Sequence, residues 1–214
     1  MRKIVLLIAT SFSAIAVSPV QAKAISGEVG IYSQFADRDV FVQADKPVVQ
    51  GLISLGINEH CSTDVWFSYG ITTKVGGEID LGASCRFNIS ENTEIELLAY
   101  RDVLSGLPDV TETGIKVTHG RLDLTVTQYF WDKNPDATRA EIGYTIQATE
   151  KLELHPAVVY ETGFGEADVV VGALDLSYAL SDKLSLKGSI FVPVYKGTDG
   201  YQKAQALIGI SCSF

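Results

Sequence analysis

Apolar and polar residues alternate with a period of two along most of this chain. In the last segment, the apolar face carries Ala204, Ala206, Ile208, Ile210, Cys212 and Phe214. Successive side chains of a β-strand point to opposite faces, so this pattern predicts strands rather than helices. After the first 22 residues, no apolar run reaches the roughly 18 residues of a membrane-spanning helix.

About twelve such runs follow one another, each about 9–14 residues long, with ten strands as an alternative because the fifth and sixth have soft boundaries. Membrane strands need about 9–11 residues, whereas strands of soluble proteins are most often about 5–6. The runs lie at 27–35, 47–58, 63–72, 77–88, 92–102, 110–118, 120–131, 137–149, 151–162, 167–180, 183–195 and 200–214.

The connections between these runs alternate between tight turns and longer segments rich in Gly and Pro. Short inner turns and longer outer loops are typical of outer-membrane barrels, whose even strand number returns both termini to the same side. The sequence therefore predicts an all-β fold, a transmembrane antiparallel up-and-down β-barrel over residues 23–214. Because lipid surrounds such a barrel, we expect the apolar face to point outward and the polar face to line the interior.

The first 22 residues have the features of a secretory signal peptide. Arg2 and Lys3 precede an apolar stretch from Ile4 to Val17, and a Val-Gln-Ala sequence ends at Ala22. We expect cleavage after Ala22 and export to the cell outer membrane. The whole chain has a net charge of −9, and losing Arg2 and Lys3 makes it more negative, which argues against nucleic-acid binding.

The chain ends on Phe214, at the close of an amphipathic last run. This ending resembles the terminal signature of outer-membrane barrels, which implies that Phe214 is recognised by the barrel-assembly machinery. Other aromatic residues on the outward face fall near the run ends, where interfacial aromatic girdles are expected.

A second resemblance lies near the N-terminus. The segment Ile31-Tyr32-Ser33-Gln34-Phe35, then Arg38, then Ala44 to Gly51, is similar to the first hairpin of the TorF-like porin family. Asp39 stands where that family usually has Gly, and the match covers about 20 residues. The resemblance implies a small outer-membrane porin that conducts small solutes or ions.

The polar face gives the candidate pore-lining residues. Among the residues on this face, those in the outer half of the barrel carry a net negative charge, and those in the inner half have nearly equal numbers of acids and bases. The candidates are Tyr32, Gln50, Trp66, Glu78, Asp80, Arg86, Glu96, Glu112, Lys116, Asp123, Arg139, Glu141, Glu153, His155, Asp175, Lys187 and Lys203.

An acidic mouth attracts cations, so we expect a narrow, weakly cation-preferring channel. The alternative is a plugged structural or adhesive barrel, because opposite charges and inward aromatic residues could fill the lumen. Leu52, Leu98 and Phe191 also point inward and break the polar-inside rule, and Pro193 falls inside a predicted strand.

Enzymatic, cofactor and metal functions are not predicted. His60 and His119 fall in predicted inner turns, and His155 faces the lumen, so no histidine lies at the external surface. The chain has no Gly-x-Ser-x-Gly motif and no closely spaced Cys or His pair that would hold a metal.

Three cysteines remain after cleavage, in an oxidising compartment. Cys61 and Cys85 fall at the inner side of the third and fourth runs and are the candidate pair for a disulfide; Cys212 is left over.

Overall fold

The strands of the computed structural model close into a barrel, described for residues 25–34, 46–71, 77–104, 110–131, 136–163, 168–196 and 204–214. The expected signal peptide (1–22), Lys203 and most of the TorF-like hairpin loop lie outside these residues. Within the described ranges, no helix has the length and apolar character needed to cross a membrane.

All the described secondary structure is β-strand, and consecutive strands pair in antiparallel register, except that β8 and β9 both pair with β10. The strands are β1 (Ile25–Tyr32), β2 (Val48–Gly56), β3 (Cys61–Gly70), β4 (Glu78–Ser90), β5 (Thr93–Leu104), β6 (Val110–His119), β7 (Leu122–Trp131), β8 (Ala137–Tyr144), β9 (Ile146–Gln147), β10 (Leu152–Thr162), β11 (Val169–Ala179), β12 (Leu184–Lys196) and β13 (Gln205–Ser213).

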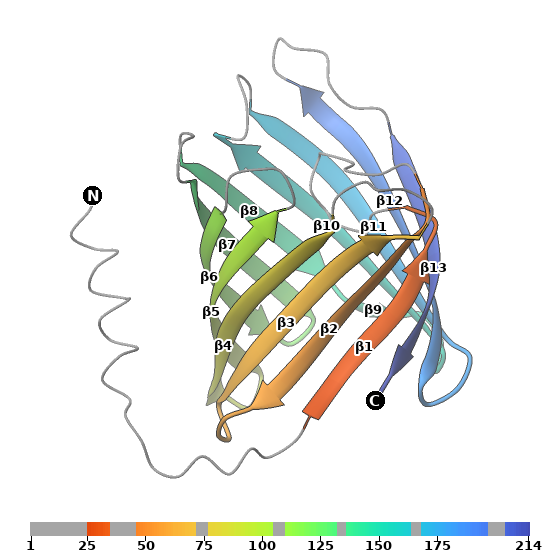
Figure 1. Cartoon of the computed structure of the whole chain (residues 1–214), viewed down its shortest axis with the longest axis horizontal. Coiled ribbons are helices and arrows are strands. Elements are labelled where there is room, and N and C mark those ends of the chain that lie inside the picture. Colours follow the sequence, from red (N-terminus) through yellow and green to blue (C-terminus); the bar gives the residue numbers. More distant parts are fainter. Residues whose placement is uncertain are drawn as a thin grey trace, which may run out of the picture.

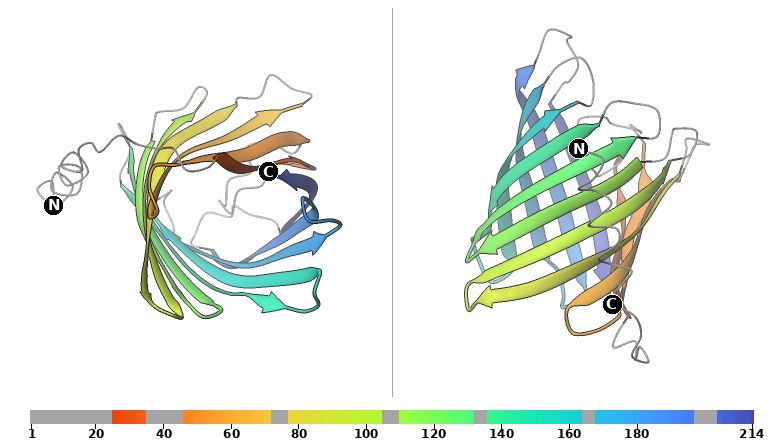
Figure 2. Two further views of the ribbon diagram at one scale, coloured as in Figure 1. Left: turned by 90° about the horizontal axis from the view of Figure 1, so that it is seen from below. Right: turned by 90° about the vertical axis from the view of Figure 1, so that its left-hand side faces the viewer.

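The first and last strands pair with each other and close the sheet. β1 lies beside β13, and backbone hydrogen bonds between Gly27 and Phe214 (3.0 and 3.1 Å) extend this seam to the chain end. Viewed along the barrel, the strands form a ring with the C-terminus at the seam (Figure 2, left), and from the side they are strongly tilted (Figure 1). The predicted barrel of about twelve strands is confirmed.

One predicted strand is divided into two labelled elements. The expected run 137–149 consists of β8 and β9, interrupted at Thr145, and both parts pair with β10 in one continuous register. The interruption lies opposite His155 and Pro156. Proline has no backbone N–H for the ladder, which accounts for the break.

The apolar face of each strand points outward, as predicted for a barrel in lipid. Nearly all exposed large hydrophobic side chains belong to it, including Ile79 and Leu81 on β4 and Ile208 on β13. The exception is Leu52, which belongs to the inward parity. An exposed apolar belt of this kind is unfavourable in water and is what a barrel presents to lipid.

The two ends of the barrel differ. We call the end with the connections 57–60, 91–92, 120–121, 148–151 and 180–183 the turn end, and the opposite end the loop end. At the turn end, Asn58, Thr149 and Ser181 share one arrangement. The side-chain oxygen of each accepts hydrogen bonds, 2.8–3.4 Å long, from the N–H groups two and three residues later. Such side-chain acceptors stabilise tight turns.

Pro193 fits into β12 because the register shifts beside it. Val171 pairs with Pro193, but the next residue of β11, Val170, pairs with Tyr195, so Val194 is the extra residue of a β-bulge. Bulges and sheet irregularities are where a strand tolerates proline. The predicted conflict at Pro193 is therefore accommodated within a strand, without ending it.

Candidate solute pathway

The inward parity lines the interior of the barrel. Inward residues of β6, β7, β10, β11 and β12 surround a cavity at the turn end. The face of each strand that carries these residues is therefore the one that faces the lumen. The strand registers place every described candidate residue on it: Tyr32, Gln50, Trp66, Glu78, Asp80, Arg86, Glu96, Glu112, Lys116, Asp123, Arg139, Glu141, Glu153, His155, Asp175 and Lys187. Lys203 is outside the described residues.

Burial divides the lumen into two halves. Toward the loop end, inward side chains are mostly covered; Val48, Val110, Val159 and Val171 are between 0 % and 3 % exposed. Toward the turn end, Arg86 and Glu153 are exposed, and His155, Asp175 and Lys187 are half-buried. The interior is therefore filled near the loop end and more open near the turn end, although Asp64, Ser84 and Asp123 are buried there.

The filled half is also acidic. Among the described inward side chains there, Arg139 is the base that accompanies Glu78, Asp80, Asp102, Glu112, Glu141 and Glu161. Asp80 and Asp102 lie directly opposite each other on β4 and β5. Arg139 Nε lies 3.5 Å from Glu161 Oε1, and both side chains are nearly buried. The described inward side chains of this half therefore carry a net negative charge.

A hydrogen-bond network centres on Asp64 at the turn end of β3. Its carboxylate accepts hydrogen bonds from Ser62 Oγ (3.1 Å), Ser84 Oγ (3.2 Å) and Tyr100 OH (3.3 Å). Tyr100 reaches Asp64 from β5 by lying across Gly82 of β4, where any Cβ would collide with its ring. A buried carboxylate is stable when donors satisfy it, and this network supplies three.

A second network centres on His155 of β10. Its Nε2 lies 2.8 Å from Asp123 Oδ1, and its Nδ1 lies 3.8 Å from Asp175 Oδ2. The imidazole crosses Gly143 of β8 to reach Asp123 on β7, and a side chain at Gly143 would occupy the same space. His155 thus connects β7, β10 and β11 across the luminal wall.

Two further ion pairs join strands, one across β13 and one between neighbours. Lys187 Nζ of β12 lies 3.4 Å from Glu28 Oε2 of β1, and Glu28 also accepts a hydrogen bond from Tyr32 OH (3.4 Å). Arg86 Nε of β4 donates to Glu96 Oε1 of β5 at 2.9 Å. The inner half, expected to be nearly balanced in charge, contains bases paired with acids across strands.

The open half contains a cavity of about 350 Å³. It is lined by Lys116, Thr118, Gly120, Arg121, Asp123, Thr145, Glu153, His155, Asp175, Leu176, Ser177 and Lys187. Within the described ranges, no group of His, Cys, Asp or Glu is arranged to hold a metal ion. The cavity is therefore a polar, mixed-charge compartment suited to a water-soluble molecule.

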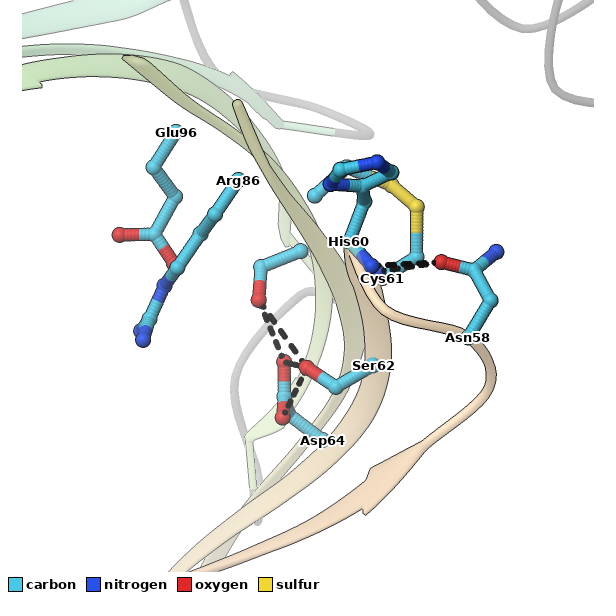
Figure 3. The surroundings of a disulfide bond; sticks show 9 residues. Asn58, His60, Cys61, Ser62, Asp64, Arg86 and Glu96 are labelled. Carbon is cyan, nitrogen blue, oxygen red and sulfur yellow. Dashed lines mark hydrogen bonds and ion pairs between the residues drawn. A yellow bond between two sulfur atoms is a disulfide. The ribbon is translucent and has the colours of Figure 1, made fainter. Parts of the chain in front are cut away.

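Cys61 and Cys85 form a disulfide at the turn end, on the outward face (Figure 3). They are directly paired residues of β3 and β4, and their Cα atoms are 4.1 Å apart. The ring of His60 stacks on that of Phe87 at 5.6 Å, beside the disulfide, and Asn58 caps the turn. Cys212 remains a free, exposed thiol.

Sequence reasoning missed part of this site. Asp102 was not among the candidates, because it lies at the end of its predicted run, although it shares the inward parity of Glu96 and Tyr100. The donors Ser62 and Ser84 were missed as well. Small polar residues carry little signal by themselves, and only the strand register brings them to Asp64.

Comparisons with known proteins support the fold. No family model matches the chain, so the TorF-like resemblance is not confirmed. No curated protein matches it either. Among solved structures, it is similar to the KdgM porin, with a TM-score of 0.63 and 14% identity over 88% of this chain and 99% of that one.

Two other solved structures are also similar to this chain. The COG4313 outer membrane channel from Pseudomonas putida F1 matches with a TM-score of 0.64 and 10% identity, over 93% of this chain and all of that one (100%). The NanC porin matches with a TM-score of 0.58 and 9% identity, over 88% and 99% of the two chains. At these identities the likeness concerns architecture, so the chain has the barrel fold found in small outer-membrane porins and channels.

Proposed function

We propose that this chain is an outer-membrane channel with a narrow, weakly cation-preferring lumen for small solutes or ions, related to the TorF-like porins. The observation that carries this proposal is the acidic luminal wall at the loop end of a closed barrel. Glu78, Asp80 and Asp102 concentrate negative charge on adjacent strands there. Rings or arcs of carboxylates favour the passage of cations.

The fold comparisons support a channel of this size. One neighbour, the KdgM porin, was solved in complex with disordered oligogalacturonate. A barrel of similar architecture can therefore hold a solute. The polar cavity at the turn end of the present chain is in keeping with such a role.

The proposal includes a cellular location. Residues 1–22 would direct export and be removed after Ala22. The barrel-assembly machinery would recognise the last strand and Phe214, and the apolar belt would contact the lipid bilayer of the outer membrane. The turn end would then face the periplasm and the loop end the exterior, as in other bacterial barrels.

One observation favours a second candidate, a plugged structural or adhesive barrel without transport. Inward side chains such as Val159, Val171 and Tyr129 are almost completely buried at the loop end. A filled interior is typical of small barrels whose side chains occupy the lumen. The two candidates differ in whether ions cross this layer of buried side chains at the loop end.

Conductance of the refolded mature protein (residues 23–214) in a planar bilayer with a salt gradient tests the proposal. We expect small, steady current steps and a reversal potential that favours the cation. Protein shown to be inserted but electrically silent would contradict the channel and support the plugged barrel. A reversal potential that favours the anion would contradict the role of the acidic wall.

A further inference from the structure

The cavity at the turn end contains charged side chains of two kinds, those held by a partner and those without one. Asp123 and Asp175 contact His155, and Lys187 contacts Glu28. The side chains of Lys116, Arg121 and Glu153 have no hydrogen-bond or ion-pair partner among the described residues. These three charges remain able to bind a solute.

The partnerless charges are separated around the cavity wall. Lys116 is on β6, and Arg121 is in the turn that joins β6 to β7. Glu153 is on β10, beyond β8 and β9, in the direction of Asp175 on β11. Since neighbouring strands are about 4.8 Å apart, Glu153 lies two strand spacings from Arg121 and three from Lys116, about 10–14 Å at the backbone.

The surrounding groups preserve this separation. Asp123, between the two sides, is engaged by His155 at 2.8 Å, and Lys187, beyond the acidic side, is engaged by Glu28 at 3.4 Å. On the far side of Lys116, Glu96 is held by Arg86 at 2.9 Å, and Glu94 lies outside the cavity lining. The cavity thus has a basic side and an acidic side, with Asp123 and the polar Thr145 between them.

We propose that this cavity is a binding site for a small zwitterion, such as an amino acid or short peptide. The solute's carboxylate would contact Lys116 and Arg121, and its ammonium group would contact Glu153. A carboxylate matches a guanidinium in a bidentate geometry, and a carboxylate side chain accepts hydrogen bonds from an ammonium. The volume of about 350 Å³ is at the lower end of ligand pockets, which suits a small solute.

The site would give the proposed channel a substrate class. A molecule carrying both charges gains from both sides of the cavity, whereas a simple anion or cation gains from one side. This inference rests on the proposed function for its purpose, but binding can be measured without conductance.

Binding is measured by calorimetry on the folded mature barrel in detergent micelles with three probes. Glycylglycine carries both charges, N-acetylglycylglycine lacks the ammonium, and glycylglycine amide lacks the carboxylate. We expect glycylglycine to bind at least about tenfold more tightly than either analogue, since each analogue loses the charge-assisted contacts of one charged group. Equal binding of the acetylated probe and glycylglycine, or no binding of any probe, would overturn the proposal.

Variants assign the two ends of the solute. Lys116→Gln and Arg121→Gln should weaken glycylglycine binding but leave the amide probe unchanged, and Glu153→Gln should weaken glycylglycine but leave the acetylated probe unchanged. Lys151→Gln and Glu150→Gln, in an exposed turn, are the charge-matched controls and should bind normally. Equal losses in controls and site variants would contradict the assignment.

Folding and conduction are checked separately. The difference in gel mobility between unheated and heated samples reports whether each variant is a folded barrel, so a misfolded variant is recognised and replaced by Lys116→Met, Arg121→Met or Glu153→Leu. Because binding is measured in micelles, a silent bilayer would contradict the channel while leaving the site intact. A conducting barrel that binds no probe would contradict the site alone.

Discussion

Inward glycines on the luminal wall make room for long side chains that cross from a neighbouring strand. Tyr100 lies over Gly82 and reaches Asp64, and His155 lies over Gly143 and reaches Asp123. Leu98, an expected exception to the polar interior, packs against Gly114 in the same manner. Gly82 and Gly143 thus allow a side chain to interact two strands away.

Gly82→Ala should destabilise the barrel, because the new methyl group would displace the Tyr100 ring and break its hydrogen bond to Asp64. Overpacking and a lost hydrogen bond together should lower the free energy of unfolding by about 2–3 kcal/mol, measured by urea unfolding in lipid vesicles. Gly188→Ala is the control, since the nearest atom to its Cβ is 3.7 Å away. Equal stability of the two variants would contradict this account.

Phe214 covers Gly27 at the barrel seam, and its backbone pairs with that residue. If the terminal aromatic is also an assembly signal, Phe214→Ala should reduce the folded barrel in the outer membrane of cells several-fold, whereas Phe214→Tyr should retain it. Ser213→Ala is the neighbouring control. Quantifying folded and unfolded bands from membrane fractions gives the measurement. Unchanged assembly of Phe214→Ala would refute the role.

At the scale of elements, turns and strands follow the sequence closely. The turn-end motif places a side-chain acceptor before an acid and then a base or imidazole, as in Asn58-Glu59-His60, Thr149-Glu150-Lys151 and Ser181-Asp182-Lys183. This recurrence is visible in the sequence and marks the tight turns. The bulge at Val194 and the break at Thr145 are not visible in alternation alone, because both depend on how a proline-containing strand pairs with its neighbour.

Ser181→Ala tests the motif, because Ser181 Oγ accepts hydrogen bonds from the N–H groups of Lys183 and Leu184. Losing this acceptor should lower the free energy of unfolding by about 0.5–1.5 kcal/mol, measured by the urea midpoint at constant slope. Asp182→Ala, which changes an exposed residue of the same turn, should have a smaller effect. A larger effect of Asp182→Ala would place the stabilisation elsewhere in the turn.

The Cys61–Cys85 disulfide joins directly paired residues of β3 and β4 that are 24 residues apart in sequence. Closing a loop of this length should stabilise the barrel by about 3 kcal/mol through the unfolded state. The double variant Cys61→Ser/Cys85→Ser should therefore unfold at lower urea concentration, and reductant should shift the wild type similarly. Cys212→Ser should behave as wild type. If reductant leaves the unfolding midpoint of the wild type unchanged, the disulfide does not contribute to stability.

At the scale of the whole molecule, strand alternation was sufficient to predict a closed barrel of about twelve strands. The inward and outward faces follow from the same period, because a side chain's parity is fixed once a strand is recognised. The pairings inside the lumen were not predictable. Which base meets Glu28 or Asp123 depends on strand stagger and side-chain length, which alternation does not encode.

The covered layer at the loop end decides whether the molecule conducts, and Tyr129 is its most informative member. Tyr129 is 5 % exposed and packs with Val110 and Ala137, with Trp131 against this cluster. Tyr129→Ala should widen the lumen and raise single-channel conductance more than about twofold, because a narrow constriction limits ion flow. Phe130→Ala removes the adjacent aromatic residue, which points outward, and should leave conductance unchanged.

If wild type is silent and Tyr129→Ala conducts, the native barrel is plugged at this layer. If wild type conducts and Tyr129→Ala gives the same conductance, the constriction lies elsewhere and the acidic wall at Asp80 and Asp102 is the next place to test.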